Sequence, residues 1–555
     1  MSKPDDPAGA TGARDAADVM AASQTERTRG EHGPHAAQGT QGPLARWLGF
    51  AALCVGMFMA ILDIQIVVTS LPAIAKALAL APDQMSWVQT SYLIAEVIAI
   101  ALTGVLTRAF GIRGLFLIAL STFTLASIAC AMATGLGSLI AARVVQGFFG
   151  GCLIPLVFSS AFLLFSGRQQ AMAATLAGGL AVLAPTLGPT IGGYITQTYS
   201  WPWLFLINVG PGIAALLVAT FVMARERIAL SVLARVDRVA LAALVIGLGL
   251  LEVTLKEAPQ RGWLSPLTLG LAVIVIASLS LLVYRCWPWP QGQRSADRVR
   301  PERAPLIDLG LLRSRNFAVS AAISFVFGIG LFSSIYLMAI FLGLVREFGP
   351  LAIGLVIIVT GVTQLIVSPL VVQADLRVDP RWLTGVGLAV LAIGLAMSMQ
   401  QTRSTGYDEM FWPQVVRGVG IMLCLIPPTR LALDHLPAAL VPDGSALFNL
   451  MRNLGGAIGI AVVDTILWQR TPVFSARLLE GLKARDAATA ETVGIPISML
   501  PPLGVEPTPG QIAMARPMIE RAGLVEAINE AWTLLAVLTA LAVVLVLVAR
   551  PHRRA

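Results

Sequence analysis

The sequence has little charge, few cysteines and few histidines, and each shortage excludes a class of protein. Charged residues make up only 13% of the 555 residues, whereas hydrophobic residues make up 56%. A soluble domain draws about a quarter of its residues from the charged types, so the apolar surplus here must be in contact with lipid. The sequence therefore indicates a membrane protein.

The five cysteines and four histidines do not form a recognisable site. The cysteines lie in or beside apolar segments at unrelated spacings, unlike a disulfide framework or a metal site. No histidine lies inside an apolar segment, and no phosphate-binding GxxxxGK loop or nucleophile–base set is present. These absences indicate that the protein is not an enzyme, binds no metal and carries no cofactor, so that an ion gradient would have to drive any transport.

Fourteen apolar segments of roughly 20 residues predict fourteen membrane-spanning helices. They are residues 47–70, 86–106, 114–133, 138–160, 171–196, 203–224, 236–257, 264–284, 316–342, 350–372, 382–400, 411–431, 444–468 and 528–549. The predicted fold class is therefore an all-α polytopic membrane protein.

The loops and a weak repeat divide the chain into regions. VVQG at 144–147 recurs as VVRG at 415–418, which is typical of transporters built from two parallel repeats. The predicted regions are a disordered cytoplasmic tail (1–43), an N-terminal six-helix bundle (44–228), two inserted transmembrane helices (229–284), a cytoplasmic linker (285–315) and a C-terminal six-helix bundle (316–550) with an outward loop (469–527).

The distribution of arginine predicts the orientation. The formal net charge is +8, but the basic residues are spread between apolar segments instead of forming a patch, which favours membrane orientation over binding to nucleic acid. The loops assigned to the inside contain most of the arginines, among them Arg225, Arg227 and Arg235. An even number of spans then places both termini in the cytoplasm.

Asp63 and Arg143 are opposite charges inside two different spans. Asp63 lies roughly 10 Å below the outer surface and Arg143 roughly 8 Å below it, at 1.5 Å of rise per residue. Burial of a charge in a membrane is costly, so a functional pair that takes up and releases a proton is favoured over a purely structural one. Gly147 and Gly151 follow Arg143 on one helix face, where small residues allow another helix to approach closely.

A second polar face runs along the span 86–106. Gln89, Tyr92 and Glu96 fall on one side of this helix, and Glu96 lies near its middle. We interpret Glu96 as a further proton carrier or as a ligand for a cationic substrate; a glutamate bonded to a neighbouring helix is the alternative. Gln89, Tyr92 and Gln146 are candidate substrate-cavity residues.

Three further candidate cavity residues lie in the thirteenth span. Asn449, Arg452 and Asn453 share one face near its inner end. Arg452 has an alternative interpretation, in which its long side chain reaches the inner membrane surface.

Five motifs, in order, resemble those of a known transporter family. They are LDIQIVVTSLP (62–72), GVLTRAFGIR (104–113), RVVQG (143–147), GPTIGG (188–193) with WPWLFLIN (201–208), and the segment FNLMRNLGGAIGIAVVDT (448–465). The set resembles the fourteen-helix drug:proton antiporter branch of the major facilitator superfamily, the EmrB/QacA type.

The resemblance implies proton-driven efflux of small lipophilic or amphipathic toxic compounds across the bacterial inner membrane. It implies that Asp63 and Arg143 serve proton coupling, and the position of Glu96 makes it a candidate to share the proton. It also implies a conformational role for several small or basic motif residues; these are Gly104, Gly111, Arg113, Gly147, Gly151, Gly188, Pro189, Gly192 and Gly193. Pro189 removes a helix hydrogen bond and the neighbouring glycines permit close packing, which suits a helix that moves.

The chain departs from the family pattern at Arg108, where an aspartate is usual. This basic replacement and the long loop before the last span resemble the EmrB-like subgroup. That similarity implies a periplasmic adaptor protein on the loop and an outer-membrane channel beyond it. Two alternatives remain: an exporter or importer of a specific metabolite with the same fold, and a membrane receptor or scaffold without transport.

Overall fold

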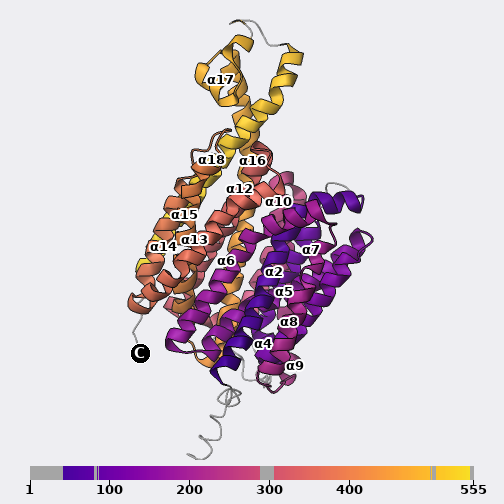
Figure 1. Ribbon diagram of the computed structural model, residues 1–555, viewed down its shortest axis with the longest axis vertical. Helices are drawn as coiled ribbons and strands as arrows, with labels where there is room; N and C mark the ends of the chain where they lie inside the picture. The colour runs from indigo at the N-terminus through magenta and orange to yellow at the C-terminus, as the bar shows by residue number, and fades with distance from the viewer. Residues whose placement is uncertain are drawn as a thin grey trace, which may run out of the picture.

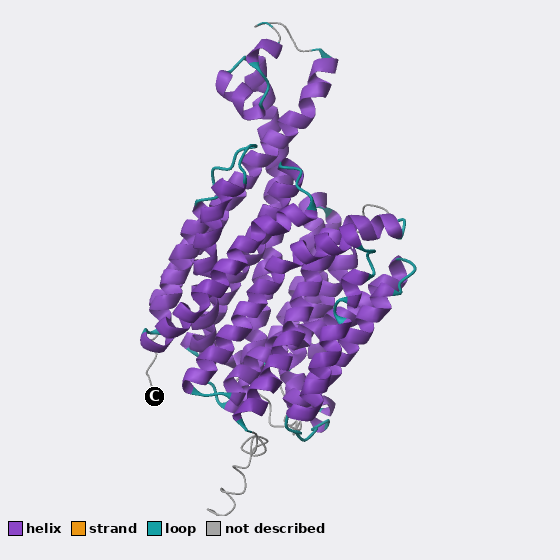
Figure 2. Cartoon of the chain, in the orientation of Figure 1, coloured by secondary structure: helices purple, strands orange, loops and turns teal. Residues whose placement is uncertain are grey.

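The computed structural model describes residues 42–80, 84, 87–287, 306–500, 502 and 508–549. Within these ranges the chain is almost entirely helical and contains no strand (Figure 2). Nearly all of the predicted tail 1–43 and most of the predicted linker 285–315 lie outside the described residues. The boundaries proposed for the domains stay a prediction.

The described helices run roughly side by side in one bundle (Figure 1). The long helices are α2 (Pro43–Ala77), α4 (Trp87–Ala131), α5 (Leu136–Leu164), α6 (Gly167–Thr198), α8 (Val209–Val222), α10 (Arg238–Arg261), α11 (Pro266–Cys286), α12 (Arg315–Ile340), α13 (Pro350–Arg377), α14 (Pro380–Ala396), α15 (Tyr407–Leu433), α16 (Val441–Lys483) and α18 (Pro509–Val548). The short ones are α7 (Trp203–Leu206), α9 (Ser231–Ala234), α17 (Ala487–Val493), the 3₁₀ turns Leu309–Arg313, Ala438–Leu440 and Ile497–Met499, and the π turn Phe341–Val345.

All fourteen predicted spans are helical. Twelve helices in the described part of the chain are long and apolar enough to cross a membrane, and α14 is a shorter apolar helix. One of the twelve, α4, bends at Gly111, whose φ of 72° only glycine adopts readily. A side chain at Gly150 of α5 would touch both Tyr92 and Phe123, so the two halves of α4 pack beside the same helix as separate passes. Together these helices form a polytopic membrane protein.

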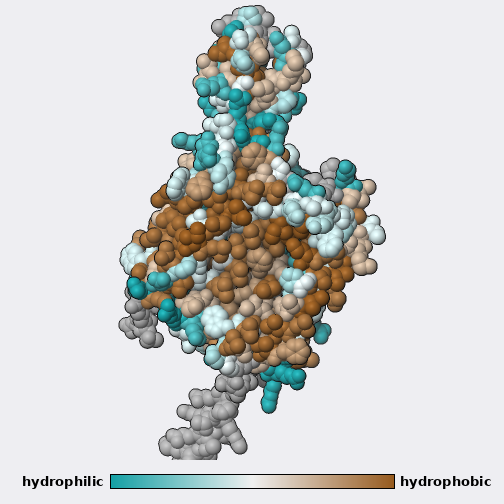
Figure 3. All heavy atoms as spheres, in the orientation of Figure 1, coloured by the Kyte–Doolittle hydropathy of each residue, from teal (hydrophilic) through white to brown (hydrophobic). Residues whose placement is uncertain are grey.

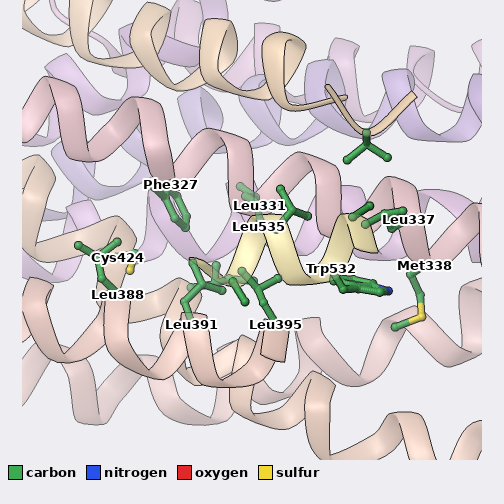
Figure 4. Close-up of a cluster of buried hydrophobic side chains, with 14 of the residues drawn as sticks. Phe327, Leu331, Leu337, Met338, Leu388, Leu391, Leu395, Cys424, Trp532 and Leu535 are labelled. Carbon is green, nitrogen blue, oxygen red and sulfur yellow. The ribbon is translucent and has the colours of Figure 1, made fainter. Parts of the chain in front are cut away.

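The apolar side chains form two main buried clusters. One joins α2, α4, α5, α6 and α8, and the other joins α12, α13, α14, α15, α16 and α18. Figure 4 shows the second cluster, in which Trp532 and Leu535 of α18 lie among leucines of α12 and α14. Each half of the chain therefore has a core of its own, and a third buried cluster of α4, α10, α12, α15 and α16 joins the two halves.

Apolar side chains also cover the outside of the bundle. Val273, Ile276, Leu370 and Leu547 each expose more than 60% of their surface, and Figure 3 shows hydrophobic residues in a broad belt across the visible face of the bundle. A continuous apolar belt of this size is a lipid-facing surface. α11 contributes to the belt and packs on α10, which in turn contacts α4 and α16.

Most of the outward region predicted at 469–527 is helix, and its helices are longer than the two short ones expected at 476–490 and 511–523. α16 continues through residue 469 to Lys483, and α18 starts at Pro509, well before the predicted span at 528. The two helices project beyond the bundle and support α17 (Figure 1). A small apolar cluster that includes Leu478, Leu482, Val493 and Ile519 stabilises them outside the membrane.

Candidate functional site

Asp63 lies at the centre of a buried polar network. Its side chain on α2 is fully buried, and it forms an ion pair with the equally buried Arg143 of α5. Its other carboxylate oxygen accepts hydrogen bonds from Gln146 at 3.0 Å and from Asn208 at 2.8 Å. Three donor side chains, two from α5 and one from the turn before α8, thus converge on one carboxylate inside the membrane.

Arg143 is held by further partners. Its Nη1 also donates to the side-chain oxygen of Gln146 at 2.8 Å, and its Nε donates to the carbonyl oxygen of Val88 at 3.2 Å. The guanidinium lies over the ring of Tyr92, 4.2 Å from the centroid. Nη2 of Arg143 has no hydrogen-bond partner, so the network retains one buried donor that a water or substrate could use.

Tyr92 and two glycines bring α4 and α5 close together. The Tyr92 hydroxyl donates to the carbonyl oxygen of Ala60 at 3.0 Å, which also ties α4 to α2. A Cβ atom at Gly147 would lie 2.9 Å from Cα of Tyr92, and one at Gly151 would lie 2.9 Å from Cα of Glu96. The glycines therefore set the distance at which Arg143 meets Tyr92.

Gly147→Ala is expected to destabilise the protein by about 1–3 kcal/mol, because the added methyl group meets rigid backbone. A lower thermal unfolding midpoint of the purified protein in detergent would report this. Gly137→Ala is the matched control on the same helix, since a Cβ atom at Gly137 meets no atom within 4 Å. Equal midpoints for the two variants would contradict the close packing of α4 on α5.

Glu96 and Gln89 lie on the same helix as Tyr92 but outside the Asp63 network. Glu96 is only 4% exposed, and among the described residues it makes no ion pair or hydrogen bond with Asp63 or Arg143. The side-chain oxygen of Gln89 is buried without a hydrogen-bond partner. The structure thus brings Tyr92 and Gln146 of the predicted cavity set to the Asp63 network, but not Gln89 of that set. It also leaves Glu96, the further proton carrier in the prediction, outside the network.

Asn449, Arg452 and Asn453 form a separate group on α16. Arg452 donates to the side chain of Asn449, and the Asn453 amide donates to the backbone oxygen of Asn449 at 3.0 Å. The guanidinium of Arg452 lies 5.4 Å from the ring centroid of Phe158 on α5. Arg452 is 5% exposed, so the interpretation that it reaches the membrane surface is wrong: Asn449 and Phe158 hold it at the contact between the halves.

The glycine-proline motif of α6 lies between the two halves. A Cβ atom at Gly188 would lie 3.3 Å from Cα of Gln65 on α2, whereas Thr190 packs against Gly354 of α13. Pro189, Gly192 and Gly193 are buried within the same stretch of α6. This helix is therefore placed to transmit movement between the halves.

The motif GVLTRAFGIR (104–113) joins the two passes of α4. It lies at the end of the bundle opposite α17 (Figure 1). Gly111 makes the sharp bend, and the backbone N–H of Ile112 donates to Glu226 at 2.6 Å. Arg113 donates to the carbonyl oxygen of Thr220 at 2.8 Å. These contacts attach the bend to the last turn of α8 and to the chain that follows it.

Arg108 of the same motif forms an ion pair with Asp443 in the first turn of α16. Asp443 is 4% exposed, and Gly104 lies directly against it. Arg108 belongs to the first half of the chain and Asp443 to the second, so the pair links the halves. The aspartate usual at position 108 is thus replaced by an arginine whose acidic partner lies across the interface.

Sequence reasoning missed several residues that these networks need. Asn208 was present in the motif 201–208 but carries no charge that would mark it, and Ser127 contacts Gln146 only through the fold. Asp443 lies one residue before the predicted span at 444, so it was assigned to a loop. Glu226 stands among arginines and has no distinguishing pattern. Asp443 could have been found from the sequence as an acidic residue directly before an apolar span.

The comparisons with known proteins agree with this architecture. Residues 53–460 match the profile of the Major Facilitator Superfamily. The chain is 36% identical over 424 residues to the colistin resistance protein EmrB of Acinetobacter baumannii, covering 76% of this chain and 80% of that protein. It is 31% identical over 433 residues to the multidrug export protein EmrB of Escherichia coli, covering 78% and 82%.

Two more distant matches are a bacterial sequence relative and a solved human structure. The fatty acid resistance protein FarB of Neisseria gonorrhoeae is 28% identical over 455 residues, covering 81% of this chain and 86% of FarB. The crystal structure of the human organic anion transporter MFSD10 superposes with a TM-score of 0.55 at 13% identity, covering 91% of this chain and 100% of that one, and supports the fold alone. The chain therefore belongs to the Major Facilitator Superfamily, a family of membrane transporters.

Proposed function

We propose that this protein exports small lipophilic or amphipathic toxic compounds in exchange for protons. The observation that carries the proposal is the fully buried Asp63, paired with Arg143 inside the membrane-spanning bundle. Protonation of the carboxylate removes its charge and weakens the pair, which changes the relative stability of the two orientations of the transporter. Because a ligand shifts such an equilibrium only by its differential affinity, substrate and proton must bind the two states unequally.

The names of the relatives support the substrate class. They refer to multidrug export, to colistin resistance and to fatty acid resistance. These compounds share an amphipathic character, which suits a transporter that accepts substrate beside the lipid. The proton gradient is the proposed energy source, without a cofactor.

The proposed location is the bacterial inner membrane with both termini in the cytoplasm. The arginine-rich loops support this orientation. In this orientation the bend at Gly111 faces the cytoplasm, and the extension formed by α16, α17 and α18 faces the periplasm. Lipid surrounds the apolar belt of the bundle.

The extension is the proposed docking site of a periplasmic adaptor protein that passes substrate to an outer-membrane channel. It projects well beyond the apolar belt (Figure 3) and exposes large apolar side chains on its surface, including Met499 and Met514. Exposed apolar residues outside the membrane favour a protein partner.

Replacement of residues 476–522 by a short glycine-serine linker tests this docking role. The design is compatible with the fold because a Cβ atom at Gly523 would lie 3.0 Å from the backbone nitrogen of Ser475, so the cut ends are already adjacent. We expect the shortened protein to retain transport in proteoliposomes but to lose the ability to protect cells. Loss of transport in proteoliposomes by a correctly folded variant would show that the extension serves transport itself.

Transport in proteoliposomes tests the proposed function. The purified protein is reconstituted, a pH gradient is imposed, and movement of a panel of lipophilic cations, neutral compounds and weak acids is followed. We expect at least one class to accumulate against its gradient only when the pH gradient is present. No movement of any class, or movement indifferent to the pH gradient, would contradict proton-driven export.

A further inference from the structure

The Arg143 site has a counterpart in the second half of the chain. The stretch Arg143–Gly147 of α5 recurs in α15 as Gln414–Gly418, with the arginine and the glutamine in exchanged positions. The same displacement along the chain carries Asp63 of α2 onto Ser334 of α12. The counterpart therefore keeps an arginine but has a hydroxyl where the first half has its carboxylate.

Helix packing supports this correspondence. The missing side chain of Gly147 faces Tyr92, and a Cβ atom at Gly418 would lie 2.8 Å from Cβ of Thr363. The displacement from Tyr92 to Thr363 is the same as that between the two glycines. The second site is thus built like the first, on α12, α13 and α15.

The arginine of the second site is buried without an acidic partner. Arg417 is 3% exposed, its Nε has no hydrogen-bond partner, and no described carboxylate forms an ion pair with it. Its guanidinium lies 5.0 Å from the ring centroid of Trp532, which stabilises the charge only in part. Removing an ion from water costs several kcal/mol unless a partner compensates. Arg417 lacks the compensating carboxylate that Asp63 supplies to Arg143.

A small cavity adjoins Arg417. Its volume is about 20 Å³, and it is lined by Ser334, Gln364 and Gln414, together with apolar residues of α12, α13 and α15. Gln364 is 1% exposed, and neither its amide nitrogen nor its amide oxygen has a hydrogen-bond partner among the described residues. Thr186 of α6 closes the cavity from the other half of the chain. Unpartnered donors therefore converge on a space, at the contact between the halves, that no acidic residue lines.

We propose that this cavity binds the anionic head group of an amphipathic substrate, whose carboxylate takes the place that Asp63 occupies in the first half. Arg417 supplies the charge, and the Gln364 amide supplies a further donor. The identification of the anion as a transported substrate rests on the proposed function, whereas binding of the anion does not.

Binding of laurate to the full-length protein in detergent tests the proposal. Isothermal titration compares laurate with dodecyltrimethylammonium, which has the same chain and the opposite charge, and with sodium chloride. We expect saturable binding of laurate that Arg417→Met weakens at least about tenfold, the scale of a lost charge-assisted hydrogen bond. Equal laurate affinity for the wild type and Arg417→Met would overturn the proposal, as would chloride binding at the cavity in place of laurate.

Two substitutions at Ser334 keep the test valid if the arginine variant folds poorly. Ser334→Asp introduces a carboxylate beside Arg417, as in the first half, and Ser334→Asn introduces a neutral group of the same size. We expect the Asp variant to bind laurate at least about tenfold more weakly than the Asn variant. Equal affinities would overturn the proposal.

The two conclusions can fail separately. Laurate binding that depends on Arg417, without transport of any compound in proteoliposomes, would contradict the proposed function and leave the site intact. Proton-driven transport of lipophilic cations, with laurate binding that ignores Arg417, would support the proposed function and overturn the site.

Discussion

Asp63→Asn is expected to abolish proton-driven export while the protein still folds in the membrane. Asparagine keeps the shape of the side chain, and its one oxygen can still accept either from Arg143 or from the amides of Gln146 and Asn208, so the packing is preserved. It carries no charge and cannot exchange a proton, so the site stays in the state that resembles protonated Asp63. Accumulation of substrate against its gradient should fall to the level of protein-free vesicles.

The matched control is Asp464→Asn, which removes another carboxylate from a spanning helix. Asp464 accepts a hydrogen bond from Tyr336 at 2.6 Å within the second half and has no contact with the Asp63 network. We expect this variant to retain export. Export by Asp63→Asn at the wild-type rate, or equal loss in both variants, would contradict a special role for Asp63.

Arg108→Asp is expected to cause the second large loss of export. Exchanging the two charges, by adding Asp443→Arg, is expected to recover part of that export. The single change places two carboxylates together at the contact between α4 and α16, where the wild type has an ion pair. Like charges at this partly buried position repel and separate the halves. Addition of Asp443→Arg restores opposite charges, but the recovery is partial because an arginine in the first turn of α16 opposes the helix dipole.

A cycle with neutral variants measures the same contact without new charges. Arg108→Gln and Asp443→Asn should each reduce export, and the double variant should be no worse than the more severe single one. The coupling energy expected for residues in direct contact is about 0.5–3 kcal/mol. Additive losses, with all variants folded to the same thermal midpoint, would show that the two side chains do not act as a pair.

The helices could be predicted from the sequence because each span is a long apolar run, and the membrane leaves few other ways to satisfy backbone hydrogen bonds. The continuation of α16 and α18 as unbroken helices beyond the membrane could not, because these segments have a composition typical of soluble helices. Their length depends on the apolar contacts that they make with each other and with α17.

The charged residues of the site could be predicted from the sequence. Asp63 and Arg143 are conspicuous because the membrane makes isolated charges costly, and estimates of depth placed them at similar levels. The hydrogen bond from Asn208 and the stacking of Arg143 on Tyr92 could not be identified in the same way, because the rotation of each helix is not determined by sequences this apolar. Arg417 was visible only as a mismatch in the repeat, and its meaning depends on the cavity beside it.

The most direct test of the account is the movement of protons when substrate is added. Inverted membrane vesicles that contain the protein are acidified, lipophilic compounds are added, and the internal pH is followed with a fluorescent dye. The account predicts that transported compounds make the vesicle interior more alkaline, and that vesicles with Asp63→Asn show no such change. Accumulation of a compound in wild-type vesicles without any change of internal pH would contradict proton-coupled export.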